Sequence, residues 1–450
     1  VIVFALLIAA LAAGWKGYRD VRAQHESARS ETRQHWLDQG KKNPHSAAHY
    51  GIYAFKPRML LSLLDRGVDQ YTGVAVWLEA HRQNEFKHRP AQDATAAQRM
   101  SELTAAAVLQ ILIPLLIILL SFSAFAGERE QGTLRQLLSI GVERRHLALG
   151  KAAGITAALS LLLVPAAILG SLALLLASDD GAIGVSLARV MIMSVGYLVY
   201  LGIFVAVSLA VSARARSARV ALIALIAFWI INTMIAPRAV ADIARRLYPT
   251  PSAFEFATRI QRDMENGIDG HNPEDKRAEE LKQRVMSQYA VRRMEDLPVS
   301  FAGISLQEGE EYGNLVFDKH YGELWSAFKR QERFSQIAGL VAPLLAARSL
   351  SMSMAGTDFE QHHSFAEAAE RYRRRLVKMM NDDMTYNAGK ADFSYLAEPE
   401  LWSRMPDFSY EAPAAFDMLK DQIAGVAMLA FWFIAATAAA LLSAVRMRVA

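Results

Sequence analysis

Residues 105–126 read AAAVLQILIPLLIILLSFSAFA, and the interpretation of the whole sequence starts from this stretch. It contains no charged residue, and an α-helix needs about 20 apolar residues to cross the hydrocarbon core of a bilayer. Pro114 lies inside it, which membrane helices tolerate where neighbouring groups satisfy the freed backbone carbonyls. Further runs of the same character are 152–178, 190–213, 220–236 and 423–445. The sequence therefore predicts a chain whose core lies in a membrane.

A sixth apolar run opens the chain at residues 1–13 and is too short to span a bilayer. We interpret it as the end of a first membrane helix, which gives six membrane helices in all. The alternative is a signal peptide, because Ala10-Leu11-Ala12 is similar to a cleavage site.

The composition excludes several classes of soluble protein. The chain has 450 residues, 53% of them hydrophobic and 21% charged, with a net charge of +4. Because the apolar residues are concentrated in a few runs, the chain is neither a soluble enzyme with one continuous core nor a disordered protein. The sequence contains no cysteine, which excludes disulfides, thiol catalysis and thiolate metal sites.

Basic residues between the runs predict the orientation, because Lys and Arg mark the cytoplasmic side of short loops. Loop 127–151 and loop 212–219 are rich in them, whereas loop 179–189 begins with two aspartates. Both termini are then cytoplasmic, and segments 14–104 and 237–422 lie outside. The basic residues are Arg129, Arg135, Arg144, Arg145 and Lys151 in the first loop, Arg214, Arg216 and Arg219 in the second, and Arg446 and Arg448 in the tail.

The predicted fold is an all-α membrane protein with a mainly helical extracytoplasmic domain. The chain divides into the end of helix 1 (1–13), a first insertion (14–104), helices 2–5 (105–236), a second insertion (237–422), and helix 6 with a cytoplasmic tail (423–450).

Within the insertions, the pattern predicts helices over 18–40, 274–296, 309–337 and 361–381, and minor strands near 297–306 and 393–397. Asn43-Pro44 has the residue types of a helix cap followed by a first helical residue. One apolar stripe is predicted at Phe365, Ala369, Tyr372, Leu376 and Met379.

Two histidine pairs have ligand-like positions: His45 and His49, which are four residues apart, and His362 and His363, which follow Asp358 and Glu360. A zinc or copper site needs three or four converging ligands, and no spacing here supplies them. We therefore expect no metal site, and helix capping by Thr357 or Asp358. We also expect five aromatic residues to form the core of the outer domain rather than a ligand platform: Trp36, Tyr50, Tyr53, Phe55 and Trp77.

Loop 127–151 contains a short amphipathic segment. Thr133 and Gln136 have the spacing of a capping box, and Gly141 is a good helix stop. Between them an apolar ridge is predicted at Leu134, Leu137, Leu138 and Ile140. Two helical turns are not stable alone in water, so this helix must lie on the membrane surface or in a groove of a partner. A plain interfacial loop is the alternative.

This loop resembles the one between the second and third membrane helices of type-2 ATP-binding-cassette (ABC) transporter permeases. In that family a Glu-x-x-x-Gly-Thr-Leu-x-x-Leu-Leu pattern, a basic pair and Gly-Lys form a coupling helix that docks on the ATPase subunit. The family often has proline where Ile140-Gly141 stands here. Segments 43–56 and 355–365 are similar to a branch with two large extracytoplasmic insertions. The matching residues are Glu128, Gly132, Thr133, Leu134, Leu137, Leu138, Arg144, Arg145, Gly150 and Lys151.

The resemblance implies a permease subunit in a bacterial inner membrane, with Arg129 and Glu130 added to the ATPase-coupling residues. It implies a cytoplasmic ABC ATPase that holds ATP and Mg²⁺, and a second permease chain, identical or related. The chain itself has no phosphate-binding loop and no nucleophile or metalloprotease motif, so no catalytic residue is assigned.

Three functions are compared. A permease either exports an amphipathic substrate or moves its periplasmic domain, with periplasmic or outer-membrane partners and no nucleic acid. The alternative is a membrane-anchored metal-binding or maturation factor that acts on periplasmic partners. A membrane-embedded hydrolase needs ionisable groups inside the spans, which offer only Gln110, Asn232 and hydroxyls.

Overall fold

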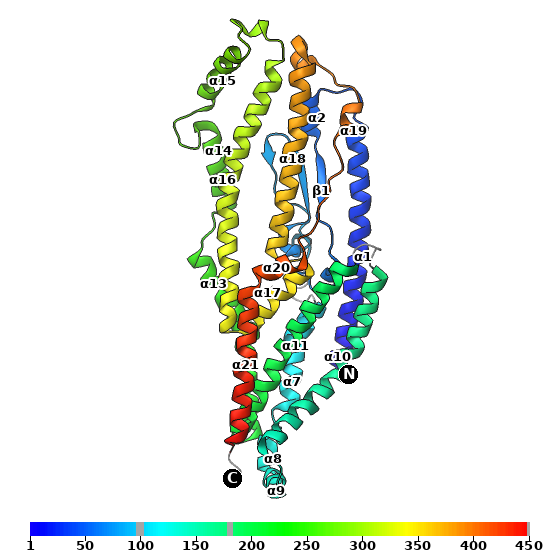
Figure 1. The fold of residues 1–450 in the computed structure, drawn as a ribbon, viewed down its shortest axis with the longest axis vertical. Coiled ribbons are helices and arrows are strands. Elements are labelled where there is room, and N and C mark those ends of the chain that lie inside the picture. Colours follow the sequence, from blue (N-terminus) through cyan, green and yellow to red (C-terminus); the bar gives the residue numbers. More distant parts are fainter. Residues whose placement is uncertain (96–102, 178–182, 448–450) are drawn as a thin grey trace.

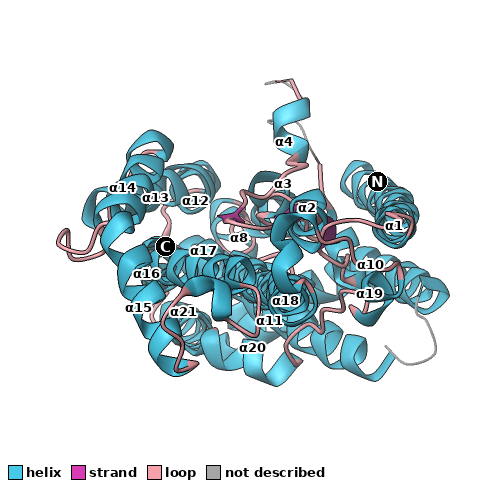
Figure 2. Cartoon of the chain, turned by 90° about the horizontal axis from the view of Figure 1, so that it is seen from above, coloured by secondary structure: helices cyan, strands magenta, loops and turns pink. Residues whose placement is uncertain are grey.

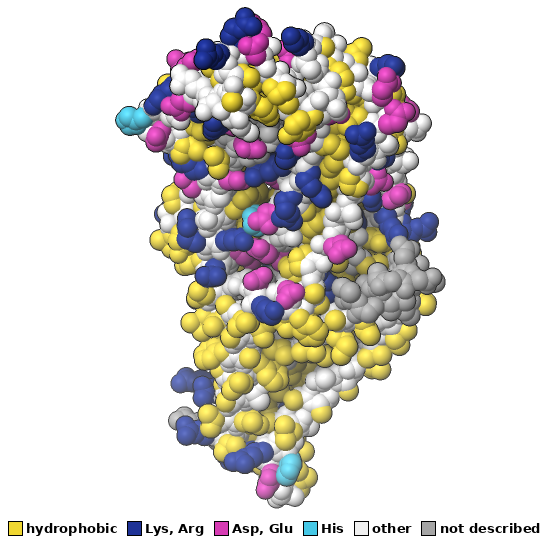
Figure 3. All heavy atoms as spheres, turned by 45° about the horizontal axis from the view of Figure 1, so that its top comes forward, with side chains coloured by type: hydrophobic (Ala, Val, Ile, Leu, Met, Phe, Trp, Pro, Cys, Tyr) yellow, Lys and Arg dark blue, Asp and Glu magenta, His cyan; other side chains and the backbone are white. Residues whose placement is uncertain are grey.

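The computed structural model describes residues 1–95, 103–177 and 183–447. It is an elongated helical molecule in which one half has an apolar surface and the other carries most of the charged side chains (Figures 1 and 3). In the described residues six helices are long and apolar enough to cross a membrane. They are Ile2–Leu37, Ala105–Glu130, Arg144–Leu174, Leu187–Arg214, Ala218–Leu247 and Ile423–Val445. The all-α membrane fold is therefore confirmed. Two aspartates used for the orientation, Asp179 and Asp180, and the tail residue Arg448 lie outside the described residues.

The spans are built from both unbroken and composite helices. The elements are α1 (Ile2–Leu37), α6 (Ala105–Ala107), η2 (Val108–Leu112), α7 (Ile113–Ser121), α8 (Ala126–Glu130), α9 (Thr133–Ser139), α10 (Arg144–Ala177), α11 (Ile183–Arg214), α12 (Ala218–Ile230), η3 (Ile231–Ile235), α13 (Ala236–Leu247) and α21 (Ile423–Val445). In Figure 1 the short helices α8 and α9 lie at the end of the spans that is far from the charged half, near the C-terminus.

Two spans contain a π-helical turn that ends two residues before a proline. The turn η2 precedes Pro114, and the turn η3 precedes Pro237. A proline removes one backbone donor and clashes with the preceding turn, and a π turn is one way to accommodate it. Gln110 lies in the first turn and Asn232 in the second. The Tyr200 hydroxyl on α11 connects them, because it donates to the Gln110 carbonyl at 2.8 Å and accepts from Asn232 Nδ2 at 3.3 Å.

The remaining elements form an extramembrane domain, which we define as residues 38–95 and 248–422. Its first part contains α2 (Pro44–Tyr50), β1 (Ile52–Phe55), η1 (Leu60–Leu63), α3 (Asp69–Thr72), β2 (Ala75–Glu79), β3 (Arg82–Gln83) and α4 (Pro90–Asp93). Its second part contains α14 (Ala253–Asn266), α15 (Glu274–Gln288), η4 (Met294–Asp296), α16 (Phe301–Ile337), η5 (Ala338–Leu340), α17 (Pro343–Ala355), α18 (Phe359–Asn387), η6 (Gly389–Ser394), α19 (Glu400–Arg404) and α20 (Ala415–Asp421). The long helices α16 and α18 stand side by side, with the small sheet next to α18 (Figures 1 and 2).

The predicted apolar stripe on α18 is confirmed. Phe365, Ala369, Tyr372 and Leu376 are buried in one cluster with Trp36 and Trp402, and Met379 packs against its edge. The helix cap at Asn43 is also confirmed, since its side-chain oxygen accepts hydrogen bonds from the backbone nitrogens of His45 and Ser46. The first helix continues outward to Leu37, as predicted for residues 18–40.

The strand predictions are wrong. Phe301 begins α16, and residue 397 makes only an isolated bridge with Lys42. The real sheet is antiparallel with the order β1-β2-β3, and it pairs Tyr53 with Trp77. Its strands have five residues or fewer, too short for a period of two to stand out in the sequence. The helix predicted for 274–296 also ends early, at Gln288.

The helix α1 passes very close to the extramembrane domain at one point. A Cβ atom on Gly14 would lie 2.1 Å from the carbonyl oxygen of Leu63, which no side chain permits. Only glycine therefore allows this approach of α1 to η1.

Candidate functional site

The helix α8 is bonded to the end of α11. The backbone nitrogens of Phe125 and Ala126 both donate to Ser212 Oγ, at 3.0 and 3.1 Å. The Arg129 guanidinium donates to the carbonyls of Ala213 and Ala215, at 2.7 and 2.5 Å. These hydrogen bonds hold α8 against the end of α11.

The predicted coupling residues divide into an inner and an exposed group. Leu134 is fully buried, and Leu138 packs against the core of the spans. Glu128 Oε1 accepts from Lys151 Nζ at 2.6 Å, and Arg144 donates to the Val445 carbonyl at 2.6 Å. Of the predicted coupling residues, Leu137 is half-buried, and Glu130, Gly132 and Arg145 are exposed. Four neighbouring residues that were not predicted as coupling residues are also exposed: Arg135, Gln136, Ser139 and Ile140.

The predicted capping box at Thr133 is wrong. The residue before α9 is Gly132, which has a φ of 76°, so Thr133 is already the first residue of the helix. Its hydroxyl donates instead to the Glu128 carbonyl at 3.2 Å. A glycine in the left-handed region makes the turn here without a side-chain cap. Gly141, predicted as the stop, has a φ of 90°, and α9 ends at Ser139.

At its other end, α11 is bonded to the extramembrane domain. Arg189, which is 1% exposed, donates to the carbonyls of Ser353 and Pro413, at 3.2 and 2.6 Å. The Tyr197 hydroxyl lies 2.8 Å from Ser351 Oγ, which in turn donates to the buried Asp65 at 2.6 Å. These contacts were not predicted, because they join segments that are far apart in the sequence.

A cavity of about 1110 Å³ lies between α1 and the first part of the extramembrane domain. Tyr53, Phe55 and Trp77 line it, as does Tyr50, which is 41% exposed. The prediction of a buried core is therefore wrong for these four aromatic residues and right only for Trp36, which is fully buried. No pattern in the sequence indicated that β1 and β2 turn one face toward α1.

The cavity also contains arginine side chains. Arg58 lines it, and its buried Nε has no hydrogen-bond partner among the described residues. Burial lowers the pKa of Arg58, and nearby Asp69 opposes this. Arg66 and the glycines of α1 complete the wall nearest to the spans. An aromatic cavity with a half-buried guanidinium is suited to a ligand with an apolar body and an anionic group.

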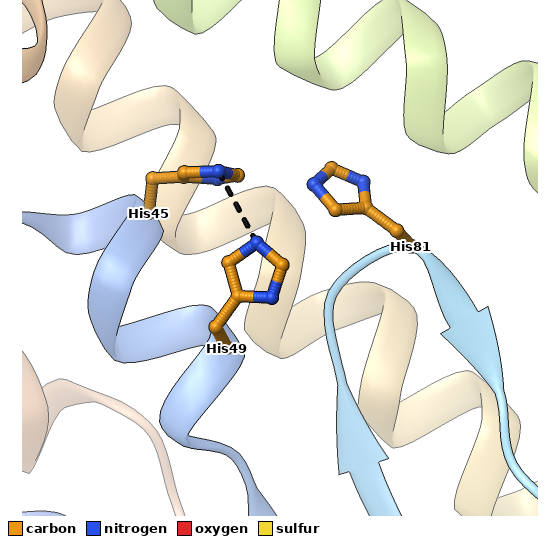
Figure 4. A group of neighbouring side chains, drawn as sticks. All are labelled: His45, His49 and His81. Atoms are coloured by element: carbon orange, nitrogen blue, oxygen red, sulfur yellow. Dashed lines mark hydrogen bonds between the residues drawn. The ribbon is translucent and has the colours of Figure 1, made fainter.

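The two predicted histidine pairs have different surroundings. His45 Nε2 lies 3.2 Å from His49 Nε2, and His81 lies beside them (Figure 4). Burial, followed by His49 and His81, lowers the pKa of His45 to about 4. Sequence reasoning missed His81, because nothing in the pattern placed it near α2.

The second pair lies at the start of α18, which Asp358 caps as predicted. His362 is buried against Phe86, and burial lowers its pKa to about 3. His363 lies between Glu360 and Glu367, at 3.7 and 3.4 Å.

A multi-pass helical protein with short helices bonded beneath its spans and a large domain above them has the architecture of a transporter membrane subunit. The chain matches the family model of the ABC-2 family transporter protein over residues 1–287, and that of a domain of unknown function (DUF3526) over residues 253–411. The first match covers more than half of the chain, so the chain belongs to the ABC-2 transporter family and is a permease, the membrane component rather than the ATPase. No curated protein and no solved structure matches it.

Proposed function

We propose that this permease couples ATP hydrolysis by a separate cytoplasmic ATPase to the export of a substrate or to a movement of its extramembrane domain. One observation carries the proposal: α9 and the residue after it present Arg135, Gln136, Ser139 and Ile140 on an exposed face, while α8 is bonded to α11. Ile140 is 75% exposed, which is unfavourable unless lipid or a partner covers it. ATP and Mg²⁺ are bound by the partner, which docks on this face.

The helix α11 supports a direct mechanical connection. It holds α8 through Ser212 at one end, and the extramembrane domain through Arg189 and Tyr197 near the other. A shift of α8 on nucleotide binding would therefore move α11, and with it α17 and the segment at Asp65. This connection favours a coupled permease over a passive membrane anchor.

The cavity beside α1 supports an amphipathic, anionic substrate or ligand. It begins at Gly14 and Gly17, near the end of the apolar part of α1, and extends beyond the spans to Trp77. A molecule that leaves the membrane would meet this cavity first. The chemistry of the site accepts a lipid-like acid or an acidic peptide with an apolar end.

A second permease chain completes the proposal, because six spans are few for an enclosed pathway. Among the six spans, Arg144–Leu174 is the least buried within the chain, which leaves most of its apolar surface for lipid or a second chain. We place the complex in a bacterial inner membrane, with the extramembrane domain in the periplasm.

Copurification of the ATPase with an Ile140→Glu variant tests the proposal. We expect the charged side chain to abolish the complex, because burying an unpaired carboxylate in an interface costs several kcal/mol. Phe254→Glu is the matched control, since Phe254 is an apolar residue of the extramembrane domain that is 83% exposed. An Ile140→Glu chain that inserts normally and still copurifies with the ATPase would show that α9 is not the docking surface.

A further inference from the structure

Three histidines of the extramembrane domain converge from two elements. His45 and His49 lie one turn apart on α2, and His81 lies in the turn between β2 and β3. One ring nitrogen of each lies within 4.8 Å of those of the other two. Figure 4 shows the three rings facing a common space, with His45 and His49 in contact.

The spacing of the nitrogens suits a tetrahedral metal ion. Two nitrogens bound to one zinc ion at 2.0–2.1 Å lie about 3.3 Å apart. His45 Nε2 and His49 Nε2 are 3.2 Å apart, so they already span one edge of such a tetrahedron. The centroid of the His81 ring lies 5.2 Å from that of His45 and 5.0 Å from that of His49. A small rotation of the His81 side chain would therefore bring its nitrogen to the position of a third ligand.

A buried carboxylate orients His81. Glu310 is 4% exposed, and its Oε1 lies 2.7 Å from His81 Nδ1. The backbone nitrogen of His81 donates to the same oxygen at 2.5 Å, and Arg373 donates to Oε2 at 3.0 Å. With Nδ1 as the donor, Nε2 of His81 has a free lone pair. A carboxylate on the far nitrogen is the arrangement that metal-binding histidines nearly always have.

The backbone at His81 has an uncommon conformation. Its φ is 63°, in the left-handed region that non-glycine residues seldom adopt. A β-turn there is more easily made with glycine or asparagine. Histidine therefore has a less favourable backbone conformation here than glycine would have. Its side chain, held by Glu310, offers a functional reason for a histidine at this position.

We propose that His45, His49 and His81 bind one divalent transition-metal ion, such as Zn²⁺ or Cu²⁺, and that Glu310 positions His81. Three neutral imidazoles favour these ions over Mg²⁺ and Ca²⁺, which prefer oxygen ligands. Three protein ligands leave one coordination position for water or for a donor group of another molecule. His49 and His81 are exposed, so the ion is accessible from the solvent. The expectation of no metal was based on pairs of histidines, and His81 supplies the missing third ligand.

Metal titration of the full-length protein in detergent tests the site, with Zn²⁺ in competition with a chromophoric chelator. We expect one equivalent to bind to the wild-type chain. His81→Asn should weaken binding by about 100-fold or more, because one of three ligands is lost. Asparagine tolerates a positive φ, so this variant keeps the turn. His49→Gln should have the same effect, and His271→Asn, an exposed histidine outside the cluster, should have none.

Two further measurements separate ligation from folding. Thermal unfolding of the metal-free variants should be unchanged for His49→Gln, since His49 is exposed. The electron paramagnetic resonance spectrum of the Cu²⁺ form should show coupling to imidazole nitrogens that His81→Asn reduces. Glu310→Gln should weaken Zn²⁺ binding by about 10–100-fold at the same stoichiometry. The site does not exist if the wild-type chain binds less than one equivalent, or if His81→Asn binds Zn²⁺ as the wild type does.

Discussion

Lys151 Nζ lies 2.6 Å from Glu128 Oε1, and this ion pair joins α8 to α10 across the whole predicted coupling loop. The two side chains are 16% and 28% exposed, so the pair is partly shielded from water. The sequence suggested that Glu128 contacts the partner directly. We propose that Glu128 acts through this ion pair, which holds the loop in the shape that presents α9.

A charge exchange tests this role. Glu128→Lys alone places two ammonium groups together, and we expect the loss of about 1 kcal/mol and a weaker complex with the ATPase. Glu128→Lys combined with Lys151→Glu restores an ion pair and should recover most of the copurified ATPase. If Glu128 contacts the partner instead, the double variant should bind no better than the single one.

Ser212→Ala should uncouple α8 from α11. The change leaves the buried backbone nitrogens of Phe125 and Ala126 without an acceptor, which costs about 1–3 kcal/mol. We expect the ATPase to remain bound while its activity no longer responds to substrate in proteoliposomes. Ser208→Ala is the matched control one turn away, since its buried hydroxyl has no hydrogen-bond partner among the described residues. Equal effects of the two changes would exclude a role for the Ser212 contact.

Asp358 makes stability depend on pH. Its Oδ1 accepts from the backbone nitrogen of Gln361 at 2.9 Å, and burial raises its pKa to about 6 from 3.8, with Glu332 adding to the rise and Lys56 opposing it. Between these values the folded state keeps a proton that the unfolded state has released. Its contribution to stability therefore falls as the pH rises from about 4 to about 6, and stays low above that.

Asp358→Asn removes this dependence and keeps a good helix cap. We expect the variant to be more stable than the wild type at pH 7, by at most roughly 3 kcal/mol for a shift of about two pKa units. The difference in thermal midpoint should shrink as the pH is lowered to 4. Parallel curves for the two proteins over this range would contradict the assignment.

Arg58→Gln should weaken the binding of an amphipathic anion in the cavity. A hydrogen bond to a charged group contributes about 1.5–3 kcal/mol, so we expect a loss of about 10-fold or more for a fluorescent fatty acid probe. Binding of an uncharged alcohol of the same chain length should change little. Arg82→Gln, an exposed arginine outside the cavity, is the control. The same loss for both probes would indicate a collapsed cavity rather than a lost charge.

The orientation is testable without background labelling because the sequence has no cysteine. Ser139→Cys places a thiol on the exposed face of α9, and Ser403→Cys places one on α19. An impermeant maleimide added to intact cells with a permeable outer membrane should label only Ser403→Cys. Labelling of Ser139→Cys under these conditions would reverse the topology.

The sequence predicted those parts of the structure that depend on local patterns. The spans follow from unbroken apolar runs, the stripe on α18 from its helical spacing, and the cap at Asn43 from one side chain and the proline after it. By contrast, His81 joins His45 and His49 only through the pairing of β1 with β2. The strands are short, and their register is determined by packing against α1 and α18 rather than by alternation.

The predicted coupling loop illustrates the same limit within one motif. Its helix and its stop at Gly141 were predicted, but the capping box at Thr133 was not formed, because Gly132 already makes the turn. The sequence also gave Leu134 and Ile140 the same role, whereas Leu134 is buried and Ile140 is exposed. Which side of a short helix faces inward depends on the partner that the rest of the chain provides.

Gly14 packs so closely against the Leu63 backbone that a tilt of α1 would pivot at this point. Before Gly14 the helix lies among the spans. After Gly14 it runs to Leu37, a length of about 35 Å at 1.5 Å per residue. A tilt of about 5° at Gly14 would displace the end of this segment, at Leu37, by roughly 3 Å. This segment of α1 forms one wall of the aromatic cavity along its length. For the same tilt, the inner end of α1 near Ile2 would move by about 1.6 Å, roughly half as far, because it is about 18 Å from Gly14.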